Sequence, residues 1–142
     1  MDKRLRDYLT KERVSALTVL LNDNTPHAAT LHFSHEGESL VFYFSVDKTQ
    51  RKCQRLLKEK ESKAALVIGF SEDNWLTFQA EGTIRLLMSP EEIKRVKKIH
   101  YAKHPSSKKF ESDPNTVFLV FKPAWWRFSD LNVEPYVLIE SK

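Results

Sequence analysis

A short basic segment of the chain combines the groups that bind a phosphate monoester. Ser45 ends an expected strand, and Lys48 and Thr49 follow it at the expected start of a helix. The N–H groups at a helix N-terminus, a hydroxyl donor and a cation suit a phosphate. Arg51 or Lys52 adds a second positive charge. The sequence therefore predicts a phosphate site here, although Thr49 as a simple helix cap, with the cations on a solvated face, explains these residues equally well.

Other reactive residue types form no recognisable catalytic or metal-binding pattern. His100 and His104 stand four residues apart on an expected helix, a spacing that suits metal chelation. No glutamate fills the metalloprotease position and no third ligand is evident, so we expect an exposed pair of histidines. Cys53 lies on the same expected helical stripe as Leu56 and Leu57, which favours a buried thiol over a nucleophile. We therefore predict no metal ligands and no catalytic side chain.

The low glycine content excludes several nucleotide-binding folds, whereas the net charge excludes no class of ligand. The chain has three glycines, whereas a dinucleotide-binding loop or a P-loop needs several at the point where the backbone closes around phosphate. A net charge of +4 is compatible with an anionic ligand, with nucleic acid or with neither. The pairs Lys97-Lys98 and Lys108-Lys109 are short and lack interleaved aromatic residues for base stacking. We therefore expect a solvated surface and no nucleic-acid partner.

Length and composition predict one domain that spans residues 1–142. A chain of 142 residues with 41% hydrophobic residues is long enough for one sizeable core. No apolar stretch approaches the ~20 residues that cross a bilayer. The single cysteine, Cys53, cannot form an internal disulfide, which suits a reducing compartment. We therefore expect a cytoplasmic protein with no membrane partner.

The hydrophobic pattern predicts a mainly β domain with three helices. One amphipathic helix contains Leu5, Tyr8 and Leu9, a second covers residues 49–61, and a third begins at the capping box of residues 89–92. Strands are expected at residues 14–21, 28–35, 40–46, 64–70, 75–88, 116–121 and 125–129. Pro123 is expected to bend the path or to lie at an edge. Many short antiparallel strands favour a small barrel or sandwich.

Several local strings, taken in order, resemble the pyridoxamine 5′-phosphate oxidase-like family of FMN-binding split barrels. The matching strings are residues 26–30, residues 42–49, residues 81–85 and residues 126–130. The resemblance covers nearly the whole chain. It implies an α+β domain, mainly β, built as a six-stranded antiparallel split β-barrel with flanking helices. It also implies a homodimer that holds FMN in clefts between its subunits and acts as an oxidoreductase on a small-molecule substrate.

An isoalloxazine ring needs a flat, largely apolar wall and a few polar groups at its edge. We expect Thr30, Leu31 and His32 to form one wall. Further candidates for the ring are Gln79, Trp125, Trp126 and Arg127, of which the last three would come from the partner subunit. The sequence does not say which tryptophan faces the flavin, and two alternatives stay open. Adjacent tryptophans are more often core or dimer-interface residues, and Gln79 is more typical of a solvated strand face.

Two features leave the activity open. True pyridoxamine phosphate oxidases carry a C-terminal Arg and His that hold pyridoxal phosphate, and residues 139–142 offer no obvious equivalent. Reduction of another small molecule, or of FMN supplied by a partner, therefore fits as well. The alternative function is a non-catalytic split-barrel module for haem, a deazaflavin or another phosphorylated ligand.

Overall fold

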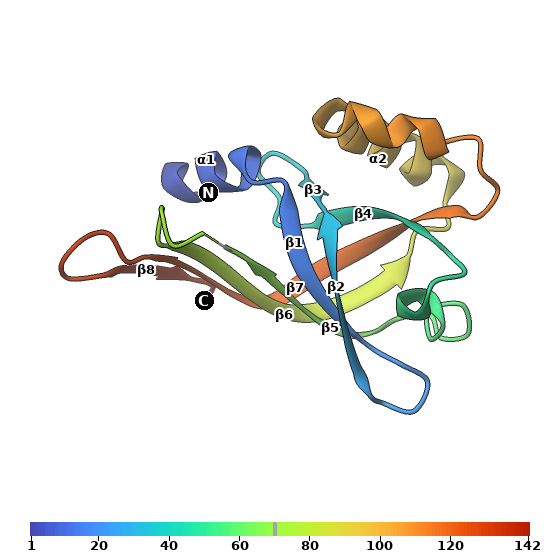
Figure 1. Cartoon of the computed structure of the whole chain (residues 1–142), viewed down its shortest axis with the longest axis horizontal. Coiled ribbons are helices and arrows are strands. Elements are labelled where there is room, and N and C mark those ends of the chain that lie inside the picture. The colour runs from blue at the N-terminus through green and yellow to red at the C-terminus, as the bar shows by residue number, and fades with distance from the viewer. Residues whose placement is uncertain (70) are drawn as a thin grey trace.

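Eight strands pair into one curled antiparallel sheet in the computed structural model of the chain, which describes residues 1–69 and 71–142 (Figure 1). The elements are α1 (Lys3–Lys11), β1 (Val14–Leu20), β2 (Pro26–His32), β3 (Ser34–His35), β4 (Phe42–Asp47), the 3₁₀ turn η1 (Arg51–Cys53), β5 (Ser62–Ile68), β6 (Leu76–Leu86), α2 (Pro90–Lys103), the 3₁₀ helix η2 (Pro105–Phe110), β7 (Thr116–Asp130) and β8 (Val137–Glu140). The strand order is β2-β1-β5-β6-β7-β4-β3, with β8 also paired to β7. The expected mainly β, curled antiparallel architecture is confirmed, with eight strands in place of six.

The sheet leaves a split between β2 and β4. These strands lie close to each other, but no ladder of paired residues joins them in the described part of the chain. β4 pairs with the first part of β7, whereas β8 pairs with its last residues. The strand expected over residues 64–70 is β5, and Phe70 lies outside the described residues.

The long strand β7 replaces two expected strands. The strands expected on the two sides of Pro123 are continuous, and this residue lies opposite Gly82, where the register shifts between Glu81 and Gly82. A Cβ atom on Gly82 would lie 2.1 Å from the carbonyl oxygen of Lys122, so a glycine is required for this close approach. The bulge accommodates the proline, which has no N–H for the ladder, and β7 continues past it.

The helix expected over residues 49–61 is wrong. That segment contains η1 and a series of turns. Cys53 and Leu56 are buried, as expected, but Leu57 is 53% exposed. Cys53 and Leu56 alone form too narrow a buried face for a helix, because helices in proteins are stabilised mainly by the packing of a broad apolar face against the rest of the fold.

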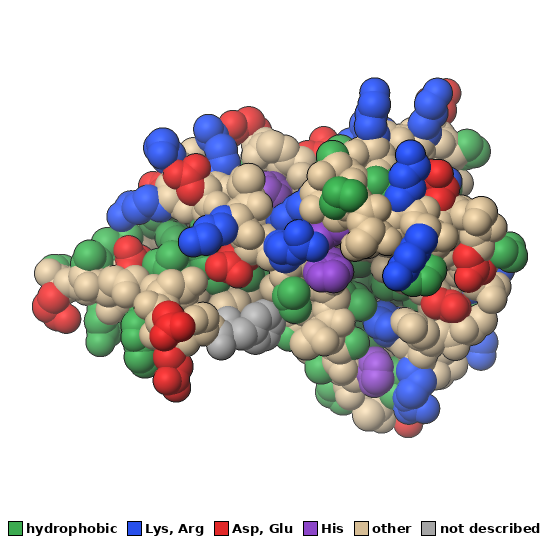
Figure 2. Space-filling view, turned by 45° about the horizontal axis from the view of Figure 1, so that its top comes forward, with side chains coloured by type: hydrophobic (Ala, Val, Ile, Leu, Met, Phe, Trp, Pro, Cys, Tyr) green, Lys and Arg blue, Asp and Glu red, His purple; other side chains and the backbone are tan. Residues whose placement is uncertain are grey.

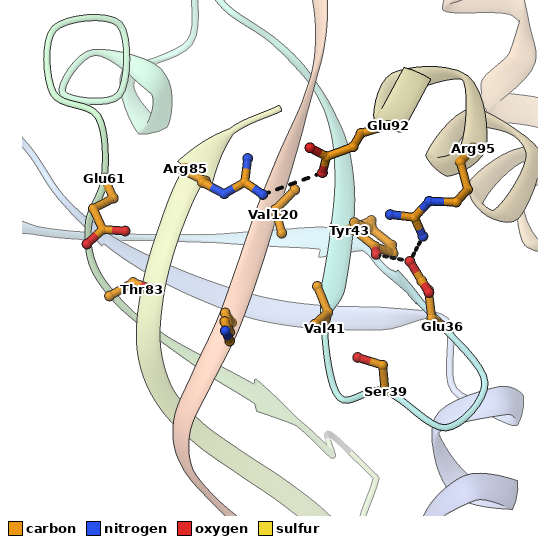
Figure 3. Close-up of a pocket in the computed structure, with 11 residues that line it drawn as sticks. Glu36, Ser39, Val41, Tyr43, Glu61, Thr83, Arg85, Glu92, Arg95 and Val120 are labelled. Atoms are coloured by element: carbon orange, nitrogen blue, oxygen red, sulfur yellow. Dashed lines mark hydrogen bonds and ion pairs between the residues drawn. The ribbon is translucent and has the colours of Figure 1, made fainter. Parts of the chain in front are cut away.

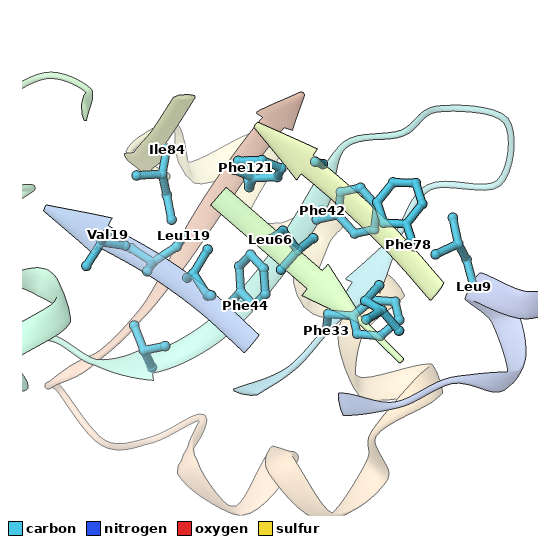
Figure 4. Packing of buried hydrophobic residues seen from close by; sticks show 14 of the residues in the cluster. Leu9, Val19, Phe33, Phe42, Phe44, Leu66, Phe78, Ile84, Leu119 and Phe121 are labelled. Atoms are coloured by element: carbon cyan, nitrogen blue, oxygen red, sulfur yellow. The ribbon is translucent and has the colours of Figure 1, made fainter. Parts of the chain in front are cut away.

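The core fills the inner side of the curled sheet (Figure 4). Its largest fully buried side chains are Phe33, Phe42, Phe44, Phe78, Phe121 and Phe128. α1 packs Leu5, Tyr8 and Leu9 against this core, as its apolar spacing predicts. A smaller cluster on the outer face of β4 and β7 lies under α2, which contributes Val96.

The start of α2 has the expected Ser89 cap and Pro90, whereas the Glu92 carboxylate pairs with Arg85 and does not close the expected capping box. The Ser89 hydroxyl accepts a hydrogen bond from the Glu92 amide at 3.4 Å, and Pro90 occupies the first helical position. This cap fixes where the helix begins and therefore which residues reach β3 at its other end. Among the described residues, neither helix has the length and apolar character that a membrane crossing requires.

Candidate cofactor cleft

Two adjoining cavities occupy the split between β2 and β4. Both are lined by Leu31, Ser45 and Phe110. One, of about 360 Å³, also contacts Thr30 and His32. The other, of about 310 Å³, extends toward the end of β4. The structure thus brings four of the predicted residues, Thr30, Leu31, His32 and Ser45, to one cleft.

The main-chain part of the predicted phosphate site differs from the expectation. The Lys48 amide donates to the Asn115 carbonyl at 2.8 Å, and the Gln50 amide donates to the Asp47 carbonyl at 3.1 Å. The Thr49 amide and hydroxyl both donate to the Asp47 carboxylate, at 2.8 and 2.7 Å. Three successive amides are therefore already bonded within the chain, and Thr49 closes a local turn. The expected row of free amides at a helix N-terminus is wrong because no helix begins here.

The basic side chains of this segment have no acidic partner within ion-pair distance among the described residues. Lys48, Arg51 and Lys52 form no ion pair within 4.0 Å among the described residues. Arg51 is exposed and Lys48 half-buried, whereas Lys52 is buried and donates to the Gln50 side chain. The amides of Arg51 and Lys52, at the start of η1, also have no acceptor in the described part of the chain. Cationic side chains, more than amides, would therefore hold an anion here.

The two helical histidines are buried, which corrects the expectation of an exposed pair. His100 and His104 are 1% and 0% exposed. The Nδ1 atom of His100 lies 2.8 Å from the Ser34 hydroxyl, and the Nε2 atom of His104 lies 2.7 Å from the Phe33 carbonyl. His32 stacks on His104 with ring centroids 4.7 Å apart. The sequence offers one indication of this burial. His100 follows the apolar residue Val96 by four positions, so both side chains lie on the face of α2 that packs against the sheet.

Burial keeps these imidazoles uncharged. Desolvation, followed by the nearby His104, His32 and Lys103, lowers the pKa of His100 to about 3. Desolvation also lowers the pKa of His104, although the bond to the Phe33 carbonyl opposes this shift. Elsewhere, no group of three or more His, Cys, Asp or Glu side chains within residues 1–69 and 71–142 is placed to hold a metal ion.

The C-terminal candidates lie away from the cleft of their own protomer. Gln79 and Arg127 face each other on the outer side of β6 and β7, where Arg127 pairs with Glu140 at 2.9 Å. The cross-strand row that contains them runs through Thr30, Ala16, Val67, Gln79 and Arg127. Four strand spacings separate its ends, roughly 19 Å. The cleft of one protomer therefore does not reach Gln79 or Arg127.

The two adjacent tryptophans have different surroundings. Trp126 packs against the core and stacks on Phe78 with ring centroids 6.1 Å apart. Trp125 lies on the opposite side of the strand, and the Arg127 guanidinium lies 5.6 Å from its ring centroid. Trp126 therefore lies on the core side of β7 and Trp125 on the outer side.

A separate cavity of about 430 Å³ lies between the start of α2 and the outer face of β4, β7 and β6 (Figure 3). Glu36 pairs with Arg95 and accepts a hydrogen bond from the Tyr43 hydroxyl. Arg85 pairs with Glu92 at 3.6 Å. These pairs join the sheet to α2 and neutralise both arginines. The cavity therefore suits a phosphate less well than the unpaired cations beside the cleft do.

Surface charge on the face shown in Figure 2 is dispersed. Lys and Arg side chains alternate there with Asp and Glu and do not merge into one basic patch. Lys97 is half-buried and lies 3.9 Å from Glu111, whereas Lys98 and the Lys108-Lys109 pair are exposed.

Comparison with known proteins gives one family and several similar folds. Residues 1–130 match the model of the family described as pyridoxamine 5′-phosphate oxidase. No curated protein matches the chain. A heme binding protein from Mycobacterium smegmatis is 13% identical, with a TM-score of 0.75 over 96% of this chain and 55% of that one. The chain thus spans about half the length of this relative.

Two further structures share the fold. Campylobacter jejuni ChuZ is 10% identical with a TM-score of 0.76, and the match covers 96% of this chain and 58% of that one. A pyridoxamine 5′-phosphate oxidase-related, FMN binding protein from Nostoc punctiforme is 18% identical with a TM-score of 0.66, over 94% of this chain and 82% of that one. At these identities the likeness concerns the fold alone.

Proposed function

The chain belongs to the pyridoxamine 5′-phosphate oxidase family, and we propose that it binds FMN and uses it for hydride or electron transfer to or from a small molecule. The observation that carries this proposal is the cleft between β2 and β4, whose second cavity is lined by Asp47, Gln50 and Asp113. The next residues along the chain after Asp47 and Gln50 are Lys48 and Arg51, which form no ion pair within 4.0 Å among the described residues. FMN joins a ring with apolar faces to a phosphate. The ring needs a largely apolar cavity, and the phosphate needs nearby cations.

The chain's own residues would bind and orient the cofactor. Lys48 and Arg51 would hold the phosphate, supported by the buried Lys52. Thr30, Leu31 and His32 would contact the ring, with Ser45 between the two ends. FMN itself supplies the redox chemistry when it is bound. No side chain is assigned as a catalytic acid or base.

A second copy of the chain would complete the site. The outer face of β1, β2 and β5 carries small or apolar side chains, including Ala16, Ala65 and Val67, the last of which is 40% exposed. A partner seated there would bring its own Trp125 and Arg127 toward the cleft that they cannot reach within one protomer. We therefore infer a homodimer with flavin at the interface.

A haem-binding module is the second candidate function. One structural neighbour is described as a heme binding protein, and the 360 Å³ cavity contacts two imidazoles, those of His32 and His100. Neutral imidazole is a common axial ligand of haem iron. A deazaflavin or another phosphorylated ligand would use the same cations.

The phosphate assignment is tested by two ligands that differ only in that group. In the double variant Lys48→Ala and Arg51→Ala, we expect FMN affinity to fall about 10- to 100-fold, because charge-assisted hydrogen bonds to the phosphate are lost. Riboflavin, which lacks the phosphate, should bind the variant and the wild type alike. Fluorescence titration of both flavins measures the two affinities.

The matched control is the double variant Lys58→Ala and Lys60→Ala, which removes the same charge from exposed positions on the same loop. It should bind FMN as the wild type does. An equal loss for FMN and riboflavin, or no loss for either, would place the phosphate elsewhere.

A further inference from the structure

His100 contacts the cavity that we assign to the flavin ring, although it belongs to none of the predicted binding groups. It lies on α2, 1% exposed, and shares the 360 Å³ cavity with Thr30 and His32. The 310 Å³ cavity near Asp47 does not include it. His100 is therefore placed at the ring end of the cleft and away from the cationic segment.

The bond to Ser34 fixes which nitrogen of His100 carries the proton. Both side chains are buried, and the Ser34 hydroxyl lies 2.8 Å from Nδ1. No other acceptor for this hydroxyl is found among the described residues. A buried hydroxyl hydrogen needs an acceptor, so Ser34 donates to Nδ1. A neutral His100 then carries its hydrogen on Nε2.

The Nε2 atom of His100 is the ring nitrogen that Ser34 leaves without a partner. It has no hydrogen-bond partner in residues 1–69 and 71–142, and yet it is not among the fully buried, unpartnered side-chain atoms there, which are Arg6 Nε, Tyr101 OH and His104 Nδ1. Some of its surface is therefore accessible, and the cavity is the space that His100 contacts. The protein thus presents an N–H donor with no acceptor of its own.

We propose that this Nε2–H group donates a hydrogen bond to an acceptor atom at the polar edge of the isoalloxazine ring. The inference rests on the proposed function and adds a ring-binding residue to it. It stands on the position of His100 in the ring cavity and on the direction of the Ser34 bond.

The surroundings of His100 preserve this neutral donor. A charged imidazolium is disfavoured by burial and then by His104, His32 and Lys103, which together lower the pKa of His100 to about 3. The ring also packs against two other rings, with centroids 5.0 Å from His104 and 5.9 Å from Phe118. A donor held in this way needs little ordering when a ligand binds.

Two substitutions separate the two nitrogens of His100. In His100→Asn, the shorter amide can still accept from Ser34 but does not extend to the Nε2 position. In His100→Gln, the longer amide offers a donor near the Nε2 position. We expect His100→Asn to weaken FMN and riboflavin by the same factor, about 3- to 10-fold, because one neutral hydrogen bond is lost. His100→Gln should restore part of the affinity.

The matched control is His27→Asn, a histidine on the same strand as His32 but outside both cavities. It should bind both flavins as the wild type does. Thermal unfolding of each variant shows whether it is folded before titration.

A third variant, Ser34→Ala, tests the proton assignment because Ser34 does not line the cavity. Without the Ser34 donor, Nδ1 can carry the proton and Nε2 can lose it, so flavin affinity should fall. Long-range ¹H–¹⁵N spectra should show the Nε2–H form of His100 in the wild type and a mixture in Ser34→Ala.

Four other results would each contradict one statement of this proposal. Unchanged flavin affinity in folded His100→Asn, with a wild type that binds FMN, overturns the role of His100 and leaves the proposed function standing. A loss for FMN alone places His100 at the phosphate and also overturns it. An Nδ1–H form in the wild type contradicts the donor assignment. Failure of the wild type to bind FMN overturns the proposed function itself, and with it the ligand of His100.

Discussion

At the residue scale, burial decides the charge of the histidines next to the cleft. Desolvation and then Lys103 lower the pKa of His35 to about 4, and the pKa of His100 falls to about 3. In the unfolded chain a histidine titrates near ~6.5. Between these values the unfolded chain binds more protons than the folded protein, so protonation favours unfolding.

We therefore predict that the free energy of unfolding is highest above the pKa of histidine in the unfolded chain and declines as the pH falls toward 4. The His100 contribution lost between pH ~6.5 and ~5 is about 1 to 2 kcal/mol. Urea denaturation at a series of pH values measures this decline. Folded His100→Asn should show a shallower decline than the wild type, and identical slopes would show that His100 is not the group involved.

The residues that could be predicted from the sequence are those whose role depends on their immediate neighbours. Thr30, Leu31 and His32 lie on β2 and Ser45 lies on β4, and the structure brings all four to one cleft, whereas their contact with a cofactor stays a prediction. His100 was expected on a solvated face because one helical turn does not reveal which stripe faces the sheet. Its partner Ser34 is 66 residues away, and such a pair follows only from the tertiary fold.

At the element scale, capping and turn chemistry were reliable guides. The polar run of residues 22–25 forms a turn in which the Asn24 backbone adopts a φ of 68°, and α2 starts at the expected Ser89 cap. The helix over residues 49–61 fails because spacing alone does not show that Leu57 faces solvent. β7 continues through Pro123 because Gly82 in the adjacent strand β6 makes room for it. Hydrophobic patterns within one segment do not show which residue of another strand lies opposite.

The Gly82 contact makes a direct prediction about stability. Gly82→Ala should destabilise the fold by more than about 2 kcal/mol, because its Cβ would lie 2.1 Å from a main-chain oxygen that cannot move without breaking the β6–β7 pairing. Gly37→Ala is the matched control, since no atom lies within 4 Å of a Cβ built there. Chemical denaturation compares the two variants. Equal small effects would contradict the close packing at the bulge.

At the scale of the whole molecule, the proposed site needs a second chain. Trp125 and Arg127 lie on an outer face that continues across small side chains toward Thr30. The family resemblance predicts that Trp125 and Arg127 contact the flavin of the partner subunit, and this stays a prediction. That assignment depends on a second molecule.

A charged substitution on this face tests the proposed dimer. The 16.6 kDa chain should behave in solution as a particle of twice that mass. Val67→Arg should yield the monomer and weaken FMN binding, because the arginine would be buried without a partner at the interface. Leu57→Arg, at a residue 53% exposed on the η1 loop, is the control and should stay dimeric. A wild type that is monomeric with FMN bound would contradict the shared site.

The most direct measurement is a titration of the purified wild-type chain with FMN, followed by flavin fluorescence and by the visible absorption band of oxidised flavin. The account predicts saturable binding of one FMN per chain, with a perturbed flavin band and tighter binding than riboflavin. If the protein leaves the fluorescence and absorption of added FMN unchanged, or binds haem in its place, FMN is not the cofactor of this cleft.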